Sequence, residues 1–136
     1  MEIGDYARTK KGDIGKIDNI TETLVSIKVE EDISLCTPKE NILISSEELF
    51  NVLFPGDYIN GREGGRIKEK VTDQNGKYFL VGHTGLYYPK NVTQVVTMEK
   101  KRILEQMKKD LREKSKELKE LKQEVKDFEK ESTYIL

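Results

Sequence analysis

The last third of the chain has apolar residues at alternating steps of three and four, which predicts one long amphipathic helix. No glycine or proline interrupts residues 98–131. When Leu104 is placed at heptad position a, the whole apolar series falls at positions a and d: Leu104, Met107, Leu111, Leu118, Leu121, Val125, Phe128 and Ile135. Lys114 and Ser132 are the two polar residues in this series. Sustained heptads predict a coiled coil, so we expect residues 98–136 to pair with another copy, in parallel or antiparallel orientation. A helix that folds onto its own barrels, with only its end pairing, stays open as the alternative.

The first 97 residues show a different pattern, in which short apolar and β-branched runs alternate with turn signals. Runs of this kind occupy residues 24–29, 67–71, 78–80, 86–88 and 92–96. Between the second and third lies Asn75-Gly76, a dipeptide that supplies the positive φ angles of a tight hairpin. Several short strands with closely spaced turns predict a small barrel or a curled sheet.

This strand-rich part repeats itself. Gly4-Asp5-Tyr6 returns as Gly56-Asp57-Tyr58, and Pro38-Lys39-Glu40-Asn41-Ile42 returns as Pro89-Lys90-Asn91-Val92. A nearly constant offset over separate landmarks indicates two copies of one small unit. The proline-lysine closures are typical of the single helical turn before the final strand of an SH3-like barrel.

The predicted fold class is therefore α+β, with two tandem small SH3-like β-barrel modules followed by one long C-terminal coiled-coil helix. The modules are expected at residues 1–45 and 56–97, and the dimerisation helix at 98–136. A serine followed by glutamates, closed by proline and glycine, predicts a linker helix at 46–55. Four apolar side chains of this linker are expected to share a face that holds the barrels together: Leu49, Phe50, Leu53 and Phe54.

Composition and charge narrow the possible partners. The net charge is −1, and residues 1–97 carry 12 basic against 15 acidic residues, so we expect no DNA or RNA partner. No apolar run approaches the roughly 20 residues of a membrane span, so no membrane partner is expected. The single cysteine, Cys36, excludes a disulfide framework and is expected to be a small core residue beside a turn. A reducing cytosol is the expected compartment.

Residue types with catalytic potential are few. His83 is the only histidine and falls in a predicted turn, and the chain has no nucleophile elbow, P-loop or metal-ligand spacing. We therefore expect no enzyme, no cofactor and no metal. The glycine-rich basic loop at residues 61–66 could cradle an anion, but a flexible β-turn with solvated arginines is favoured because no helix N-terminus follows it.

The strongest candidate site lies where the helix leaves the second module. Residues 98–112 hold six basic against three acidic residues, and aromatic residues and an asparagine are close in sequence. Aromatic rings stack bases, an amide reads a polar edge, and paired cations hold a diphosphate. The predicted ligand-binding residues are Phe79, Tyr87, Asn91, Arg102, Lys108 and Arg112. A solvated helix face above barrel-core aromatics stays open as the alternative.

The opening stretch, Gly4-Asp5-Tyr6-Ala7-Arg8-Thr9-Lys10-Lys11-Gly12-Asp13-Ile14-Gly15-Lys16-Ile17, resembles small proteins of phages that infect Gram-positive bacteria. A β-rich N-terminal part followed by a long dimerising helix is similar to the first Thoeris anti-defense family. That resemblance implies a phage protein in the host bacterial cytoplasm that binds glyco-cyclic ADP-ribose without cleaving it. Relatives in that family also take up cyclic oligonucleotide signals.

The first functional hypothesis is a homodimer or higher homo-oligomer that sequesters a cyclic ADP-ribose-type signalling nucleotide and blocks Thoeris-type signalling. The second is a protein-binding adaptor or inhibitor that docks on a host protein, a role that tandem SH3-like units and a coiled coil would serve equally well. Binding of RNA or DNA is the third hypothesis, and the acidic balance of the modules argues against it.

Overall fold

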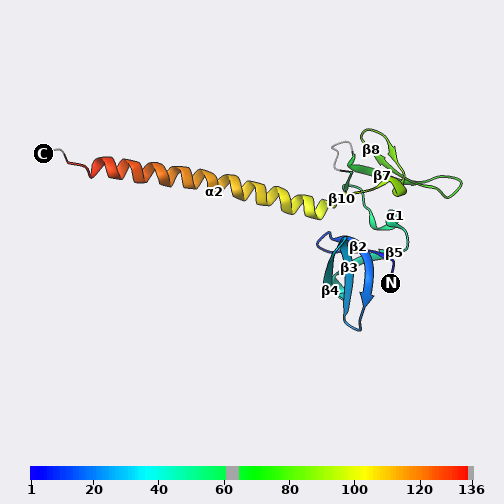
Figure 1. Ribbon diagram of the computed structural model, residues 1–136. Helices are drawn as coiled ribbons and strands as arrows, with labels where there is room; N and C mark the ends of the chain where they lie inside the picture. Colours follow the sequence, from blue (N-terminus) through cyan, green and yellow to red (C-terminus); the bar gives the residue numbers. More distant parts are fainter. Residues whose placement is uncertain (61–64, 135–136) are drawn as a thin grey trace. The chain divides into compact units, whose positions relative to one another are not determined.

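The computed structural model describes residues 1–60 and 65–134. The chain divides into two compact units, Met1–Lys101 and Arg102–Leu136, and each is described by itself. The described residues form three antiparallel sheets and a long C-terminal helix, so the α+β class is confirmed (Figure 1). The sheets are compatible with small barrel-like modules, although the described strands pair as open sheets and do not close a barrel.

The first module is a five-stranded antiparallel sheet with the order β4-β3-β2-β1-β5. Its strands are β1 (Tyr6–Thr9), β2 (Ile14–Ile20), β3 (Leu24–Glu30), β4 (Ile33–Pro38) and β5 (Ile42–Ser46). A single 3₁₀ turn, η1 (Lys39–Asn41), separates the last two strands, as the proline-lysine closure predicts.

The second module repeats this order with shorter strands. They are β6 (Tyr58–Ile59), β7 (Ile67–Thr72), β8 (Tyr78–Gly82), β9 (Leu86–Tyr87) and β10 (Val95–Val96), with the 3₁₀ turn η3 (Pro89–Asn91) before the last. β7, β8 and β9 form one sheet, and β10 pairs with β6. An isolated bridge between Tyr58 and Arg66 connects β6 to β7, which gives the order β9-β8-β7-β6-β10.

The repeat extends to individual backbone hydrogen bonds. The N–H of Gly4 donates to the carbonyl of Ile17 over 2.8 Å. At the equivalent place, the N–H of Gly56 donates to the carbonyl of Ile67 over 2.7 Å. Both glycines have positive φ angles, +94° and +102°, which side-chain-bearing residues rarely adopt. The two copies seen in the sequence are therefore two copies of one local structure.

Each module has a hydrophobic core of its own. The first is built around four buried residues of β1, β2 and β3: Ala7, Ile17, Val25 and Ile27. The second is built around five buried residues: Phe50, Leu53, Ile59, Ile67 and Leu80. Alternation along the strands places the strand residues of both sets on the inner faces, and Phe50 and Leu53 are added from α1 and the residue after it.

The linker helix is a single turn, α1 (Leu49–Val52), because β5 extends to Ser46 and Leu53 has an extended backbone. The Phe50 ring stacks on Tyr78 with centroids 4.4 Å apart, so α1 belongs to the second core. The predicted linker at residues 46–55 is thus partly strand and partly extended chain around this turn. Because α1 also contacts β1 and β5, and Ile14 of the first module packs against the same core as Phe50 and Leu53, the linker lies against both modules.

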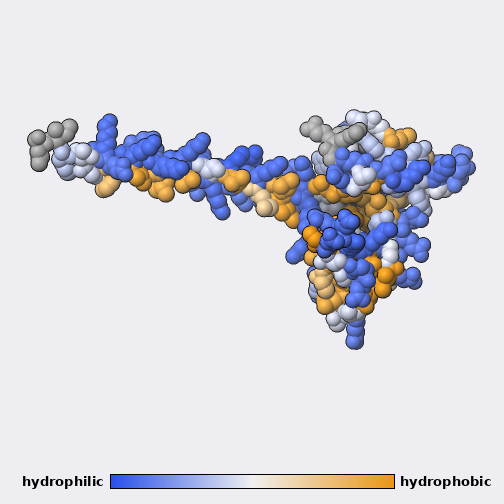
Figure 2. Space-filling view, in the orientation of Figure 1, coloured by the Kyte–Doolittle hydropathy of each residue, from blue (hydrophilic) through white to orange (hydrophobic). Residues whose placement is uncertain are grey.

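The long helix, α2 (Met98–Glu131), has 34 residues, and none of them is buried. Thr97 caps its start, because the Thr97 hydroxyl accepts a hydrogen bond from the N–H of Lys100 over 3.3 Å. Seven apolar residues lie at heptad positions a and d, and we call them the α2 seam: Leu104, Met107, Leu111, Leu118, Leu121, Val125 and Phe128. Figure 2 shows apolar residues along one side of α2.

Candidate functional site

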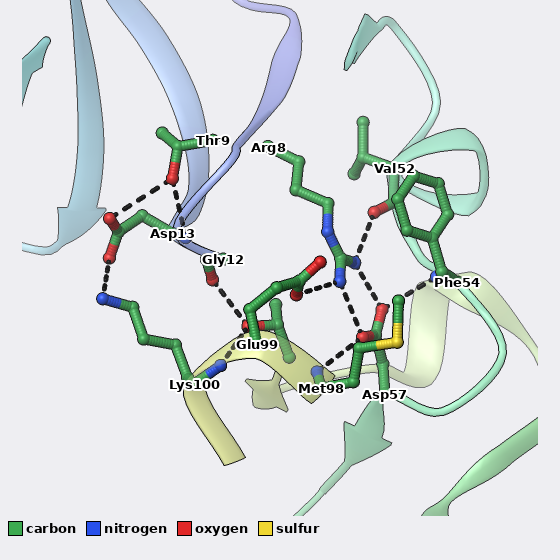
Figure 3. A network of polar contacts seen from close by, with 11 residues as sticks. Arg8, Thr9, Gly12, Asp13, Val52, Phe54, Asp57, Met98, Glu99 and Lys100 are labelled. Carbon is green, nitrogen blue, oxygen red and sulfur yellow. Dashed lines mark hydrogen bonds and ion pairs between the residues drawn. The ribbon is translucent and has the colours of Figure 1, made fainter. Parts of the chain in front are cut away.

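The most extensive polar cluster of the first unit surrounds Arg8 in β1 (Figure 3). Its guanidinium is fully buried and donates to both carboxylate oxygens of Asp57, over 2.5 and 2.9 Å. It also donates to the Val52 carbonyl over 3.0 Å and to the Glu99 carboxylate over 2.5 Å. The centre of the Phe54 ring lies 4.2 Å from the guanidinium carbon. One arginine therefore joins the first module, the linker, the second module and the first turn of α2.

Asp57 is the acceptor at the centre of this cluster. Besides Arg8, its carboxylate accepts the N–H of Phe54 over 2.8 Å and the N–H of Met98 over 3.0 Å. Met98 is the first residue of α2, where unpaired N–H groups favour a negative charge. The buried carboxylate thus caps a helix and neutralises an arginine at the same time.

Two further contacts hold the same region together. The Thr97 hydroxyl donates to the Gly12 carbonyl over 2.8 Å, and Lys100 forms an ion pair with Asp13 at 3.0 Å. Gly12 has no space for a side chain, because an added Cβ would lie 2.3 Å from the Thr97 hydroxyl oxygen. The β1–β2 turn and the start of α2 are therefore closely packed against each other.

The Arg8 cluster has a structural role. Burial opposes the charge on Arg8, but the hydrogen bonds and attraction of Asp57 and Glu99 outweigh it and raise the Arg8 pKa. Four of its donated hydrogen bonds go to protein oxygens, so the guanidinium is already engaged and is poorly placed to clamp a ligand. The cluster joins the two modules, and a groove lies between them.

A groove with a volume of about 680 Å³ lies between the first module and residues 92–97 of the second. Lys16 of β2 and Lys28 of β3 line it, and the Lys16 ammonium lies 5.2 Å from the centre of the Tyr6 ring. Glu30 is a carboxylate on the same lining. The remaining lining includes aliphatic and polar side chains: Ile14, Val29, Leu49, Val92, Thr93, Gln94, Val95, Val96 and Thr97.

Two of the predicted site residues, Phe79 and Tyr87, lie on opposite faces of the β7-β8-β9 sheet. Tyr87 pairs with Leu80 across the strands and packs against the second core. Phe79 precedes Leu80 and so faces the other way, where its ring contacts Tyr88 with centroids 5.1 Å apart. The structure therefore does not bring these two rings into one stack.

The other predicted site residues are exposed. Asn91 lies in η3, and its backbone carbonyl accepts a hydrogen bond from the Asn60 side chain over 3.2 Å. Arg102, Lys108 and Arg112 lie on α2 and belong to the second unit. Three members of the predicted set are thus in each unit, and their combination into one pocket stays a prediction.

His83 and Cys36 both lie on the surface. His83 is exposed in the turn between β8 and β9. Cys36 is exposed on β4, so its prediction as a core residue is wrong: its neighbours Leu35 and Thr37 point inward, and Cys36 alternates outward. The first four residues of the 61–66 loop lie outside the described residues.

Sequence reasoning missed the residues that the structure groups most closely. Asp57 could have been singled out, because it lies in the repeated glycine-aspartate-tyrosine signal. Arg8 and Glu99 gave no such signal, since they are 91 residues apart and resemble any other charged residues. Lys16, Lys28 and the Tyr6 ring were missed for the same reason: no local pattern shows that β2, β3 and residues 92–97 line one groove.

Within the described residues, no group of three or more histidine, cysteine or acidic side chains is arranged to hold a metal ion. No helix in the described part of the chain is long and apolar enough to cross a membrane. A scan against protein-family models, a search of curated proteins and a search of solved structures each found no match. The function therefore has to be argued from the residues of this chain.

Proposed function

We propose that the protein is a non-catalytic, self-associating binding protein that sequesters a cyclic signalling nucleotide. Glyco-cyclic ADP-ribose and cyclic oligonucleotides are the ligands that the layout of the chain suggests, and their removal would block Thoeris-type signalling. Sequestration needs affinity and many copies of the protein, and it needs no reaction. The observation that supports a ligand of this class is the groove lined by Lys16 and Lys28.

The size and lining of the groove support a ligand of this class. The groove volume of about 680 Å³ lies within the roughly 300–1,000 Å³ of small-molecule sites. Lysine ammonium groups bind phosphates as compact point charges, and Lys16 and Lys28 are both exposed on this lining. Aliphatic side chains such as Leu49 and Val95 offer an apolar surface for a base or a ribose. The groove therefore takes the place of the predicted set as the first site to test.

Self-association is supported by the α2 seam. Its seven side chains are 42–69% exposed in the single chain. Complete burial of one such side chain is worth about 1.5–3 kcal/mol, so a partner that covers the seam would stabilise the helix substantially. An isolated helix derives little stability from propensity alone. A second copy is the partner that repeats the same seven-residue period.

Calorimetry with glyco-cyclic ADP-ribose and with cyclic di- and trinucleotides tests the proposal. We expect micromolar or tighter binding, with Lys16→Ala and Lys28→Ala each weakening it about 10-fold or more, because each removes a charge-assisted contact. Lys77→Ala, in the exposed turn before β8, is the matched control and should bind normally. Lys108→Ala and Arg112→Ala test the predicted α2 residues separately. The absence of any heat with all these ligands would reject the nucleotide.

The edge of β10 supports a second function, docking on a host protein. β10 pairs with β6 on one side, and Val95 and Val96 also line the groove. An exposed strand edge can accept an extended peptide as an added strand. A pull-down from host lysate separates the two functions: a stoichiometric host protein lost on Val95→Pro would favour the adaptor, and retained nucleotide would favour sequestration.

A further inference from the structure

The self-association in the proposed function leaves the orientation of the partner open, and the charges that flank the α2 seam favour one orientation. We infer that two copies of α2 pair in parallel and in register as a two-stranded coiled coil. The occupant of the seam is thus a second copy of this chain, aligned with its own N-terminus beside that of the first. The charges on both flanks, the hollows between seam residues and the place of Lys114 carry this inference.

The surface of the seam has the relief that knob-into-hole packing needs. One hollow of about 500 Å³ is lined by Leu104, Met107 and Leu111 with Lys108, Asp110 and Lys114. Another of about 410 Å³ is lined by Leu121 and Val125 with Lys122, Lys126 and Glu129. In a coiled coil, each a or d side chain inserts between four residues of the facing helix. The first hollow ends at Lys114 and the second begins at Leu121. The seam therefore has two apolar segments, Leu104 to Leu111 and Leu118 to Phe128, separated by Lys114.

An antiparallel pair would bring like charges together. The register that places Leu104 opposite Phe128 of the second copy also pairs Met107 with Val125 and Leu111 with Leu121. Leu118 then faces Lys114. On one flank positions e then face e, and Lys108 meets Lys122 twice. Positions g face g, and there Asp110 meets Glu124 twice while Glu117 meets itself. That arrangement has five like-charge contacts, and only the two contacts between Lys101 and Glu129 are attractive.

In a parallel pair, the same flanking charges make equal numbers of attractive and repulsive contacts. Position g then faces position e five residues later in the partner. Glu117 meets Lys122 in two attractive contacts, and Glu124 meets Glu129 in two repulsive ones. Asp110 faces the neutral Ser115. Like charges that face each other cost free energy and disfavour the wrong partner orientation, so the flanks select the parallel pair.

Lys114 is the residue that a parallel pair must accommodate, because the two copies of Lys114 then face each other at position d. Asp110 and Glu117 lie four residues before and three residues after it on the same helix, so each ammonium has carboxylates on its own flank. The long aliphatic stem can reach that flank while its methylenes cover the seam. Such an exit to water is widest in a two-stranded coil, and a single polar seam residue also fixes the register.

The parallel arrangement has a consequence for binding. Both chains enter α2 at its N-terminal end, so the two copies of the first unit are tethered at the same end of the coil. Two grooves at one end would raise the effective concentration of the second binding event for a ligand or partner that carries two sites. An antiparallel coil would separate the two tethering points by most of the helix, about 50 Å at 1.5 Å per residue.

Disulfide trapping of the full chain tests the orientation, in a Cys36→Ser background because Cys36 is exposed. Met107→Cys and Val125→Cys are each oxidised alone and as an equimolar mixture, and the linked peptides are identified by mass spectrometry. A parallel pair places each position opposite itself, so each variant should form dimers alone and the mixture should yield only like-with-like links. Lys116→Cys, at the outward position f, is the control and should remain unlinked.

Crosslinks between positions 107 and 125 in the mixture, with little crosslinking of either variant alone, would overturn the parallel orientation. That result would leave the proposed function intact, since it still shows a dimer. Sedimentation equilibrium of the natural chain should give two subunits, and a monomer at high micromolar concentration would overturn the orientation and the self-association together. Ligand calorimetry on the same sample then decides the nucleotide separately.

Discussion

The two glycine-aspartate-tyrosine turns have the same backbone and very different surroundings. The Asp5 N–H donates to the Glu2 carbonyl, and the Asp57 N–H donates to the Phe54 carbonyl, both over 3.1 Å. Each carboxylate accepts the N–H three residues before it, over 3.0 Å at Asp5 and 2.8 Å at Asp57. Asp5 is half-buried, whereas Asp57 is fully buried against Arg8.

The difference comes from what lies opposite each turn. The second turn meets Arg8 of the first module and the first residue of α2, so its carboxylate joins a buried ion pair and a helix cap. Local sequence therefore determines the backbone of both turns, and tertiary neighbours determine how much each aspartate contributes to stability. Substitution of matched residues in the two copies measures that difference directly.

The largest effect is expected at the two aspartates. Asp57→Ala leaves the Arg8 guanidinium buried without its main partner and should lower the free energy of unfolding by about 3–5 kcal/mol. Asp5→Ala removes one ordinary hydrogen bond and should cost roughly 0.5–1.5 kcal/mol. Chemical denaturation followed by near-ultraviolet circular dichroism of tyrosine is the measurement, because five of the six tyrosines lie in residues 1–97.

A double variant keeps this comparison decisive if Asp57→Ala fails to fold. Arg8→Met with Asp57→Asn removes both buried charges and keeps a polar acceptor for the start of α2, so it should recover much of the lost stability. If Asp5→Ala and Asp57→Ala lowered the free energy of unfolding equally, the two turns would not differ in their contribution to stability as we expect.

A smaller effect, similar in both modules, is expected at Gly15 and Gly65. A Cβ at Gly15 would lie 2.2 Å from the Lys28 carbonyl oxygen, and a Cβ at Gly65 would lie 2.2 Å from the Ile59 carbonyl oxygen. Each alanine must push backbone apart, so we expect a loss of about 1–3 kcal/mol from either one. Thermal unfolding with the same tyrosine signal would show it.

Exposed neighbours provide the controls for these glycines. Asn19→Ala in β2 and Lys68→Ala in β7 should change stability by no more than about 0.5 kcal/mol. If Gly15→Ala and Gly65→Ala were as mild as these controls, the close backbone approach shared by the two modules would not be a constraint on their sequences.

The sequence predicted local elements well where one short pattern determines one conformation. The repeated strands, the two single turns at Lys39–Asn41 and Pro89–Asn91, and the long α2 all follow such patterns. The hairpin after β7 was predicted only in part. Gly76 has the expected positive φ of +77°, while Asp73 organises the turn by accepting two backbone N–H groups over 2.8 Å.

Long-range contacts could not be predicted in this way. The ion pair of Arg8 with Asp57 joins residues 49 positions apart, and its energetic weight depends on burial that no local pattern shows. Phe79 and Tyr87 illustrate the same limit, since composition counts both as aromatic and only strand register shows that they face opposite ways. The ion pair and the orientation of the two rings depend on packing across the whole chain, whereas the strands and helices follow from short-range periodicity.

The smallest expected effect concerns Asp18 in β2, where the equivalent place in β7 carries Lys68. Hydrogen bonds from the Ser26 and Ser34 hydroxyls lower the pKa of Asp18 below its ordinary 3.8, and the Ser34 hydroxyl donates over 2.6 Å. A depressed folded-state pKa means that the ionised carboxylate adds stability above about pH 3.8, and that this contribution is lost as the pH falls through the lower folded value.

Asp18→Asn should therefore be slightly less stable than the natural chain near neutral pH, and the difference in Tm should shrink towards zero near pH 2. Paired thermal unfolding at several pH values measures that difference, with Asn19→Ala as a neighbour that has no titrating group. A difference that stayed constant down to pH 2 would mean that the serine hydroxyls do not favour the ionised form. The carboxylate would then be an ordinary surface charge, and the two modules would not differ in acid sensitivity at this position.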